Sequence, residues 1–467
     1  MKLSFLLDCA DICADGKCFD DEILHIETNT SRAIEISDGS ILFICIKGAK
    51  YDTHGDIDLL IQKGIRNFVI LQGYNVTPKY KDINIISCED TRKALALMTR
   101  AFCGFPDKRL CTVAVTGTKG KTTVTYMLES ILRGADIKCG IIGTNGIIYD
   151  GECFSCENST PGSCEFYLHL SRMAERGITH VVCEVTSQAL KQYRTYGTVF
   201  DVGAFTNIFP DHIGKDEHES FEEYMQCKGR LFSQCKRAVI NADDGFCSYY
   251  SDICRKNGVP FELFCTSDGA DCKINLPGEF NKQNAVCARS IARLLGVSEE
   301  KIAEGLASVK VSGRCERVEN PAGIDIVIDY AHNGESLENI LKALKKECKG
   351  RLICVFGAGG DRSRLRRSGM GEASSLFADF SIVTSDNPRS ENPLDIIMDI
   401  VKGMKSEHYI VIPEREKAIC YALDMAKKGD TVLLAGKGAQ NYQEICGVKY
   451  PFDERIAVSQ YYRNKIR

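Results

Sequence analysis

A run of glycine, lysine and threonine in the first third of the chain has the composition of a phosphate-binding loop. The run, Thr116-Gly117-Thr118-Lys119-Gly120-Lys121-Thr122-Thr123, joins an apolar run from Cys111 to Val115 to a helical pattern from Thr123 to Leu132. Its glycines let backbone N–H groups turn toward an anion, its lysine can neutralise phosphate charge, and its hydroxyl can reach Mg²⁺. The run therefore predicts a nucleotide site, in a loop shorter than the usual G-x-x-x-x-G-K-[ST]. The alternative is a glycine-rich turn between a strand and a helix.

Acidic and amide side chains stand at the ends of two further predicted strands. Glu184 ends the apolar run 180–184, Asn207 follows the run 200–206, and Asp211-His212 comes next. The carboxyl ends of strands in an open α/β sheet form the edge where ligands bind. Carboxylate oxygens suit Mg²⁺, so Glu184 is expected to bind a metal ion. The alternative for Glu184 is a surface residue that caps the next helix.

Glycine, aspartate and arginine follow four predicted strands in the last third of the chain. The four ends are Asp329-Tyr330-Ala331-His332, Gly357-Ala358-Gly359-Gly360-Asp361-Arg362, Ser385-Asp386-Asn387-Pro388-Arg389 and Gly436-Lys437-Gly438. Together they imply a shared polar pocket. Arg362 and Arg389 could bind carboxylates through planar, bidentate contacts. Either arginine taken alone could equally be a solvated surface charge.

Apolar runs that alternate with helical patterns must position these groups. Strands are expected near 41–46, 68–71, 111–116, 139–142, 180–186, 200–206, 237–241, 325–329, 352–356, 380–384, 409–412 and 431–435. The alternation predicts an α/β fold, and the length suits about three domains. We expect an N-terminal domain (1–106), a central domain with a P-loop-type doubly wound sheet (107–312) and a C-terminal Rossmann-like α/β domain (313–467).

Composition excludes several classes of protein. The chain has 467 residues, 44% of them hydrophobic, and a net charge of −4, which argues against nucleic acid as a main partner. No apolar run reaches the roughly 18 residues of a membrane span, and the N-terminus lacks the apolar core of a signal peptide. A cytoplasmic protein is expected. The 24 cysteines are scattered, and Cys153-x-x-Cys156 lacks the second pair of a zinc site, so free thiols are expected.

These segments, taken in order, resemble the Mur ligase family, which builds the peptide stem of peptidoglycan. The motifs that carry the resemblance are Thr116–Thr123, Glu184-Val185-Thr186-Ser187, Phe205-Thr206-Asn207 with Asp211-His212, Asn241-Ala242-Asp243-Asp244, Gly278-Glu279-Phe280-Asn281 with Asn284, Gly313-Arg314, Asp329–His332 and Gly436–Gly438. Each is weak alone, and the ordered set is specific. The first domain, with Thr30-Ser31-Arg32, and the segment 386–389 resemble the MurE type.

The resemblance implies an ATP-dependent amide ligase that adds the third amino acid to UDP-N-acetylmuramoyl-L-alanyl-D-glutamate. The substrate carboxylate would attack the ATP γ-phosphate, and the amine would then displace phosphate from the acyl phosphate. ATP is a co-substrate and Mg²⁺ the cofactor. No nucleic acid and no membrane span are implied, and a monomer is expected. Catalysis would rest mostly on positioning and charge stabilisation.

The resemblance also assigns residues to roles. The nucleotide would be bound by Gly117, Thr118, Lys119, Gly120, Lys121, Thr122, Thr123, Asn281, Arg314 and Asp329. The muramoyl dipeptide would be bound by Ser31, Asn158, Ser159, Thr160, Thr186, Gln192 and Arg194. The amino acid would be bound by Arg362, Asp386, Asn387, Pro388, Arg389, Gly436 and Gln440. The metal would be held by Thr122, Glu184 and a carbamylated Lys228. The catalytic set is Lys121, Glu184, Lys228 and His212, with no proton transfer assigned to His212.

The pattern Asp-Asn-Pro-Arg favours meso-diaminopimelate, whose distal carboxylate would pair with Arg389. The chain departs from the family after Gly436-Lys437-Gly438, where Ala439-Gln440 replaces the usual His-Glu. Lys119, Gln188 and Gly334 also replace common family residues, and the segment after Asp211 is two residues longer. The alternatives are a paralogue that uses L-lysine or another amine or acceptor, a folate- or cyanophycin-type ligase, and a nucleotide-binding regulator without catalysis.

Overall fold

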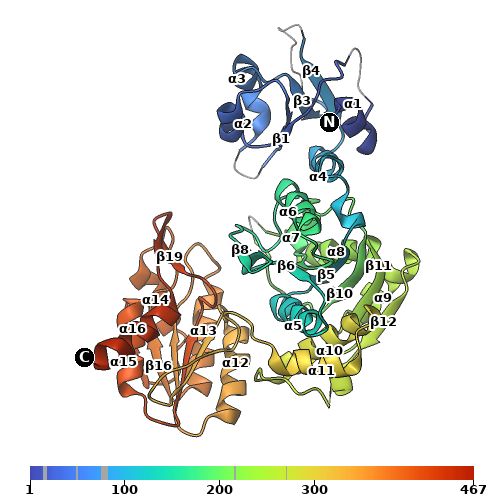
Figure 1. Cartoon of the computed structure of the whole chain (residues 1–467). Coiled ribbons are helices and arrows are strands. Elements are labelled where there is room, and N and C mark those ends of the chain that lie inside the picture. Colours follow the sequence, from blue (N-terminus) through green and yellow to red (C-terminus); the bar gives the residue numbers. More distant parts are fainter. Residues whose placement is uncertain (14–17, 49–50, 75–81, 215–216, 270, 467) are drawn as a thin grey trace. The chain divides into compact units, whose positions relative to one another are not determined.

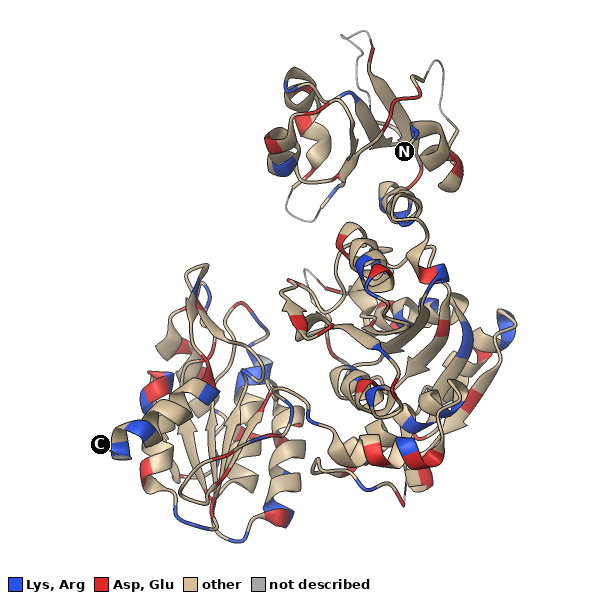
Figure 2. Cartoon of the chain, in the orientation of Figure 1, with Lys and Arg blue, Asp and Glu red and all other residues tan. Residues whose placement is uncertain are grey.

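The computed structural model describes residues 1–13, 18–48, 51–74, 82–214, 217–269 and 271–466. The chain forms two compact units, which are considered separately. The first holds Met1–Asp268 with Val286–Gly305, and the second holds Gly269–Ala285 with Leu306–Arg467 (Figure 1). The division runs through two helices, α10 (Glu279–Leu294) and α11 (Glu299–Ser308). Figure 2 shows basic and acidic residues interspersed along both units, in keeping with the small net charge.

A four-stranded parallel sheet near the N-terminus is the first element of unit 1. Its order is β1 (His25–Glu27), β2 (Ile41–Ile44), β3 (Asn67–Leu71) and β4 (Asn84–Cys88). Side chains alternate along β2, so Leu42 and Ile44 meet one apolar cluster and Ile41 and Phe43 meet another. The first cluster includes α1 (Leu3–Cys9) and α4 (Thr91–Phe102), and the second includes α2 (Thr30–Ile36) and α3 (Ile57–Gln62). The sheet is therefore covered on both faces.

An eight-stranded sheet forms the rest of unit 1, in the order β12-β11-β10-β5-β9-β6-β7-β8. Its parallel strands are β12 (Phe261–Phe264), β11 (Cys235–Asn241), β10 (Phe200–Phe205), β5 (Cys111–Thr116), β9 (His180–Glu184) and β6 (Cys139–Gly143). Two antiparallel strands, β7 (Gly146–Tyr149) and β8 (Glu152–Phe154), extend one edge. The predicted doubly wound sheet is confirmed, and the β7–β8 extension is a feature that the alternation did not predict.

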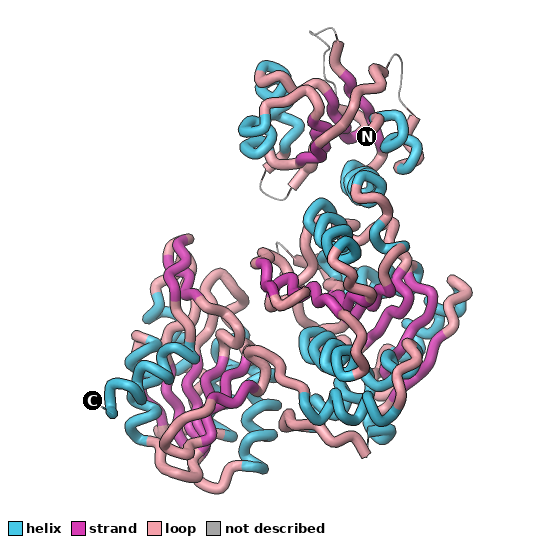
Figure 3. The backbone as a smooth tube through the Cα atoms, viewed as in Figure 1, coloured by secondary structure: helices cyan, strands magenta, loops and turns pink. Residues whose placement is uncertain are grey.

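Helices cover both faces of this sheet. α5 (Lys121–Gly134) packs on β5, β6 and β9, and α6 (Ser163–Glu175) contributes Phe166 and Leu170 to a cluster with Val181 and Cys183 of β9. Figures 1 and 3 show α5 and α6 on opposite sides of the strands. The remaining helices of this sheet are α7 (Ser187–Lys191), α8 (Phe221–Gly229) and α9 (Cys247–Lys256). The loops that matter for the site follow β5, β9 and β10.

A six-stranded sheet organises unit 2, in the order β13-β14-β18-β15-β16-β17. The strands are β13 (Glu316–Val318), β14 (Asp325–Asp329), β15 (Leu352–Phe356), β16 (Phe380–Val383), β17 (Tyr409–Val411) and β18 (Thr431–Ala435). All pairs are parallel except β13 with β14. The helices are α12 (Gly334–Glu347), α13 (Leu365–Phe377), α14 (Pro393–Val401), α15 (Arg415–Met425) and α16 (Glu454–Ile466). This arrangement confirms the predicted Rossmann-like α/β domain.

A hairpin of β19 (Tyr442–Ile445) and β20 (Val448–Pro451) stands apart from the six-stranded sheet. Its first strand touches the segment after β16, because Arg389 and Ile445 form a parallel bridge. Among the described helices, none combines the length and apolar character needed to cross a membrane. All 24 cysteines are free thiols, as expected.

A buried ion pair ties two strand ends of unit 2 together. Arg415 Nε and Nη2 lie 2.9 and 2.8 Å from Glu454 Oε1, and both side chains are fully buried. The same guanidinium donates to the carbonyls of Ser385, after β16, and Ala435, the last residue of β18. Because a buried charge without its partner is costly, the pair and its two carbonyl contacts fix these strand ends.

We expect Glu454→Gln to lower the free energy of unfolding of unit 2 by about 3–5 kcal/mol, because it leaves Arg415 buried without a counter-charge. Urea titration followed by amide hydrogen exchange in β16 and β18 measures this. Lys417→Gln on α15, the helix that carries Arg415, is the control, since the exposed ion pair of Lys417 with Glu414 contributes less than about 1 kcal/mol. Equal effects of the two substitutions would contradict the role given to the buried pair.

Candidate active site

The glycine loop after β5 has a backbone that only glycine adopts easily. Gly117 has a φ of +154°, and a Cβ there would lie 1.9 Å from Thr206 Oγ1. Gly120 has a φ of +87° and immediately precedes α5, which begins at Lys121. The N-terminal N–H groups of a helix favour an anion. The predicted strand, loop and helix are all present, with the helix beginning two residues earlier than the sequence pattern indicated.

The end of β10 holds this loop in place. Thr118 N–H donates to the carbonyl of Asn207 at 2.8 Å, and Lys119 N–H donates to Asn207 Oδ1 at 2.9 Å. In return, Thr206 Oγ1 and Asn207 Nδ2 donate to the carbonyl of Lys119 at 2.6 and 3.2 Å. Tyr224 of α8 adds a hydrogen bond from its hydroxyl to Thr118 Oγ1 at 3.0 Å. The loop is thereby preorganised by side chains more than 80 residues away.

A buried carboxylate lies beside the first turn of α5. Glu184, at the end of β9, is 1% exposed. Its Oε1 accepts from Thr122 Oγ1 at 2.9 Å and from Thr144 N–H at 2.8 Å, and its Oε2 accepts from Thr144 Oγ1 at 3.0 Å. Gly143 makes room for it, since a Cβ there would lie 2.4 Å from Glu184 Oε1. Thr122 and Glu184, predicted as metal ligands, are therefore in direct contact.

Two lysines share one backbone carbonyl of the loop. Lys121 Nζ and Lys228 Nζ each lie 2.8 Å from the Gly117 oxygen. Lys228 comes from α8 and is 1% exposed. Burial lowers the pKa of Lys228 well below its ordinary value, and the charge of Lys121 lowers this pKa further, although Asp211 opposes the shift. Burial and Lys121 both favour the neutral amine of Lys228 over its ammonium form.

The other predicted residues of this edge lie farther out. Lys119 Nζ approaches Asp211 Oδ2 at 3.4 Å. His212 has a φ of +56°, its Nδ1 lies 3.1 Å from Glu217 Oε1, and its side chain is 45% exposed. The centroids of the His212 and Tyr224 rings lie 6.0 Å apart. The place of His212 in the catalytic set stays a prediction.

Most of the residues predicted to bind the dipeptide form one hydrogen-bonded group next to Glu184. Thr160 Oγ1 donates to the Glu184 carbonyl at 2.8 Å and lies 3.4 Å from Thr186 Oγ1. Arg194 donates to the Thr160 carbonyl at 2.6 Å and to Gln192 Oε1 at 3.1 and 2.9 Å. Ser159 Oγ lies 2.8 Å from Thr144 Oγ1. The remaining two residues lie outside this group. Asn158 precedes Ser159 in the chain, and Ser31 is an exposed residue of α2, a helix that covers the four-stranded sheet.

The ends of β18 and β16, the two strands that flank β15 in the sheet of unit 2, meet around a buried lysine. Lys437, after β18, is fully buried and lies 3.3 Å from Asp386 Oδ1 and 3.1 Å from Asn387 Oδ1. Asn387 Nδ2 donates to Gln440 Oε1 at 2.9 Å. Gly436 has a φ of +117°, and a Cβ there would lie 2.5 Å from Asp386 Oδ2. The sheet order thus brings together the predicted ends of β18 and β16, which sequence separates by about 50 residues.

Arg389 is already engaged by a carboxylate of its own chain. Its Nε lies 3.3 Å from Glu444 Oε2 of β19, and Nη1 donates to the Gly360 carbonyl at 2.7 Å. Its backbone is held as well, at a φ of +51°, by hydrogen bonds with Glu444 and Cys446. Arg362 is exposed and lies in the segment after β15 that also carries Gly360. The two arginines therefore differ: one is fixed against the hairpin and one faces solvent.

A second buried carboxylate ends β14. Asp329 accepts hydrogen bonds from the backbone N–H groups of Cys315 and Ala331, each at 2.8 Å. Burial raises the pKa of Asp329, and the charge of Arg314 opposes this rise. Arg314 lies over the Tyr330 ring at 4.5 Å, and Asn281 donates to Cys315 Sγ at 3.8 Å. Asn281, Arg314 and Asp329, predicted to bind nucleotide, form one neighbourhood within unit 2.

Three contact residues escaped the sequence analysis. Thr144 donates twice to Glu184, and nothing in its local sequence marks it. Lys437 stood in a quoted motif but was not expected to be buried. Glu444 is one residue of a short strand, and only the register of the hairpin brings it to Arg389. Local pattern carries none of these contacts, because each joins segments that are distant in sequence.

Comparisons with known proteins agree along the chain. The Mur ligase middle domain family matches residues 115–259, and the Mur ligase, glutamate ligase domain family matches residues 313–438. A Clostridium acetobutylicum protein named UDP-N-acetylmuramoyl-L-alanyl-D-glutamate--2,6-diaminopimelate ligase 1 is 39% identical over 445 residues, which are 90% of this chain and 91% of that protein. A solved structure of a UDP-N-acetylmuramoyl-L-alanyl-D-glutamate--2,6-diaminopimelate ligase is 25% identical and has a TM-score of 0.69. The match covers 100% of this chain and 100% of that chain.

A folate-pathway relative matches less of the chain. The Mycobacterium tuberculosis folylpolyglutamate synthase complexed with ADP has a TM-score of 0.62 at 16% identity. It covers 73% of this chain and 91% of its own. At that identity the likeness extends to the fold alone.

The loop geometry yields a binding prediction. We expect Lys121→Ala to weaken Mg²⁺–ATP binding by about 10–100-fold, because a charged hydrogen bond contributes about 1.5–3 kcal/mol. Isothermal titration with a non-hydrolysable ATP analogue measures it. Lys138→Ala is the control, since Lys138 is exposed at the start of β6. An unchanged affinity in Lys121→Ala would remove this lysine from the nucleotide site.

Proposed function

The chain belongs to the Mur ligase family, and on that premise we propose that it joins meso-diaminopimelate to UDP-N-acetylmuramoyl-L-alanyl-D-glutamate with ATP. The observation that carries the proposal is the 39% identity, over 90% of the chain, to a relative named for that activity. The likeness to a solved ligase of the same name over the full chain supports it. The reaction is the formation of an amide bond with release of ADP and phosphate.

The first step is transfer of a phosphoryl group. A carboxylate oxygen of the dipeptide attacks the γ-phosphorus, the bond to the bridging oxygen breaks, and ADP leaves an acyl phosphate behind. The loop N–H groups at the start of α5 and the ammonium of Lys121 face the phosphates and offset the charge that develops. The hydrogen bonds of Asn207 and Thr206 keep the loop in place during this step. The protein's contribution is therefore position and charge.

The second step forms the amide bond. The amine nitrogen attacks the acyl carbon, a tetrahedral intermediate forms, and phosphate leaves as the nitrogen loses a proton. Thr160, Thr186 and Arg194 would hold the acyl substrate, and the polar group that they form beside Glu184 supports this role. Ser31, in the first sheet's domain, would contact the uridine end. We assign no proton transfer to His212.

The residues around Glu184 fit a magnesium ion. A buried carboxylate and the Thr122 hydroxyl are hard oxygen ligands, which Mg²⁺ prefers. Thr122 and Glu184 would hold the ion, which supplies positive charge for the phosphate oxygens when bound. Lys228 as an ammonium would oppose a cation. As a carbamate it would become an anionic oxygen ligand.

The surroundings of Lys228 support the proposal that this lysine is carbamylated. The neutral Nζ attacks carbon dioxide, an N–C bond forms, and one proton is released. Because the pKa of Lys228 is lowered by burial and by Lys121, the neutral amine is available at lower pH than for an exposed lysine. The resulting anion would lie near Lys121, so carbamylation would replace the repulsion between the two lysine charges with an attraction.

The amine is selected by unit 2. Arg389 can pair with the distal carboxylate of meso-diaminopimelate, which L-lysine lacks. Asp386 and Asn387, held by Lys437, offer oxygens to an ammonium group. Gln440 is neutral and accepts a hydrogen bond from Asn387, so it brings no charge of its own. Because Glu444 already engages Arg389, the substrate carboxylate must displace it.

Three other functions make different predictions. A folate-type ligase would leave the N-terminal sheet without a role, and the folylpolyglutamate synthase covers only 73% of this chain. A regulator without catalysis would bind nucleotide and release no phosphate. A paralogue that uses L-lysine would discriminate against the distal carboxylate. The assays below separate all three from the proposal.

Bicarbonate should control activity through Lys228. We expect turnover to fall in buffer stripped of carbon dioxide and to return with added bicarbonate, and Lys228→Ala to be inactive under both conditions. The ¹³C NMR spectrum with ¹³C-bicarbonate should show a carbamate carbon in the wild type. Lys138→Ala should keep that signal. A signal that persists in Lys228→Ala would place the carbamate elsewhere.

Amine choice should follow Arg389 and Glu444. With meso-diaminopimelate, we expect Arg389→Ala to lower kcat/KM by about 10–100-fold, the cost of a charged hydrogen bond. Glu444→Gln should lower KM by about 2–5-fold, because a partly exposed ion pair contributes up to about 1 kcal/mol. Phosphate release with diaminopimelate, L-lysine, L-ornithine and lanthionine measures both, and mass spectrometry identifies the products.

Arg364→Ala is the control for this panel, since Arg364 is an exposed arginine of the same unit. Turnover with L-lysine but not with diaminopimelate would transfer the proposal to the paralogue. Nucleotide binding without turnover by any amine would favour the regulator.

A further inference from the structure

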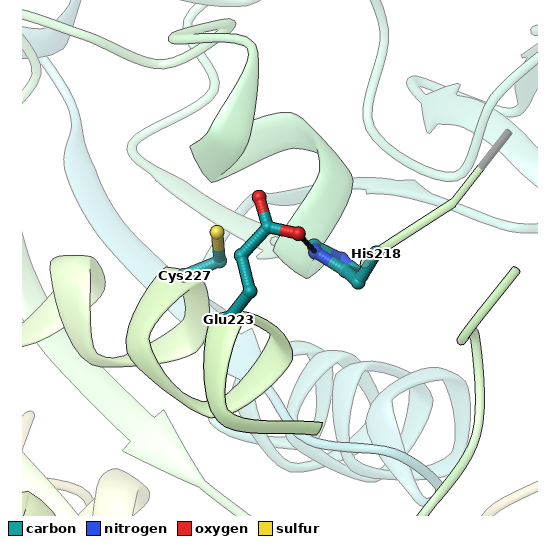
Figure 4. A group of neighbouring side chains, drawn as sticks. All are labelled: His218, Glu223 and Cys227. Atoms are coloured by element: carbon teal, nitrogen blue, oxygen red, sulfur yellow. Dashed lines mark ion pairs between the residues drawn. The ribbon is translucent and has the colours of Figure 1, made fainter. Parts of the chain in front are cut away.

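Three side chains of types that can bind a metal ion lie together at α8. Glu223 and Cys227 stand four residues apart on the helix, so they share a face. His218 precedes the helix, whose cap is Ser220, and its ring turns toward Glu223 (Figure 4). One atom from each side chain lies within 4.8 Å of the other two: an imidazole nitrogen, a carboxylate oxygen and a thiol sulfur.

One ring nitrogen of His218 is buried and makes no hydrogen bond with a described residue. The His218 side chain is 1% exposed, and its Nε2 lies 2.9 Å from Ser187 Oγ. Its Nδ1 has no hydrogen-bond partner among the described residues and faces Glu223 Oε2 at 3.6 Å. With the proton on Nε2, donated to Ser187, the Nδ1 lone pair points at a carboxylate oxygen. Two acceptors then face each other, and a cation between them satisfies both.

We propose that His218, Glu223 and Cys227 bind one zinc-like dication through Nδ1, a carboxylate oxygen and Sγ. Nitrogen, oxygen and sulfur together are typical ligands of Zn²⁺ and unlike the all-oxygen set that suits Mg²⁺. Zn²⁺ bonds of about 2.0–2.3 Å set tetrahedral ligand atoms about 3.5 Å apart, so the three atoms must draw slightly together. Three protein ligands leave the fourth position for water or another small ligand.

Lys191 limits the affinity of this site. Its Nζ lies 2.7 Å from Glu223 Oε1, on the side of the carboxylate away from His218. The Glu219 N–H donates to Glu223 Oε2 at 2.8 Å. Together, the contacts of Lys191 and Glu219 hold the Glu223 carboxylate close to the His218 imidazole. A positive charge so near repels a dication. Removing that charge should therefore strengthen metal binding, a gain that damage to the fold would not produce.

Metal binding here would act on α8. The same helix carries Tyr224, whose hydroxyl bonds to Thr118, and Lys228, whose ammonium bonds to the Gly117 carbonyl. A metal that joins His218 to two positions of α8 restrains this helix against the segment that follows β10. The inference does not depend on which amine or acceptor the chain uses, because it concerns only the contacts of α8.

The test is a titration of the full chain, reduced and freed of metal by chelation, with Co²⁺ and then Zn²⁺. We expect one Co²⁺ per chain with a thiolate charge-transfer band and tetrahedral d–d bands, both displaced by Zn²⁺. Cys227→Ala and Glu223→Gln should bind at least about tenfold more weakly, since even groups behind metal ligands contribute about 10–100-fold. Lys191→Met should bind more tightly than the wild type.

Cys254→Ala is the matched control, because Cys254 is likewise a buried helical cysteine and lies on α9. It should keep the wild-type stoichiometry, spectrum and affinity. Equal losses in Cys227→Ala and Cys254→Ala would mean adventitious thiol binding only and would overturn the site. An unchanged Co²⁺ spectrum in Cys227→Ala would also overturn the site. Equal metal affinity in Lys191→Met and the wild type would do the same, and His218 and Glu223 would then be an ion pair only.

Discussion

Two lysine side chains on one carbonyl, one of them almost wholly buried, are the constraint around which this edge of the eight-stranded sheet is built. Lys121 and Lys228 both donate to the Gly117 oxygen, and Lys228 is almost wholly buried. Like charges at such a distance in a poorly solvated place are unfavourable unless an anion joins them or a proton leaves. In the proposed function, phosphate oxygens would supply that anion, and carbamylation would replace the positive charge of Lys228 with a negative one.

The same logic explains why the loop needs so many distant supports. A loop that gathers positive charge would relax away from it if its backbone were free. Hydrogen bonds from Thr206 and Asn207 to the Lys119 carbonyl, together with the Tyr224 contact, prevent that movement. Gly117 lets Thr206 approach closely, since a Cβ would overlap its hydroxyl. The glycines thus serve the packing of the loop against β10 as much as its approach to an anion.

Sequence reasoning succeeded where function lies in local pattern. The strand ends, the loop and the start of α5 follow from apolar runs and glycine spacing, and the parallel sheets then bring Thr122 to Glu184. It failed where a contact depends on register between remote segments. The turn between β6 and β7 brings Thr144 into contact with Glu184. The hairpin after β18 brings Glu444 into contact with Arg389. No periodicity encodes those pairings, because each is set by tertiary packing.

The change at position 440 is best understood together with position 444. Position 440 holds a glutamine where the resemblance leads us to expect a glutamate, so the side chain carries no charge. Gln440 Oε1 accepts a hydrogen bond from Asn387. Glu444, four residues on, restores a negative charge to the pocket edge but directs it at Arg389. In the proposed reaction, a ligand carboxylate would therefore compete with Glu444 for the Arg389 guanidinium. If the ligand displaced Glu444, the freed carboxylate would supply the pocket edge with the negative charge that Gln440 lacks.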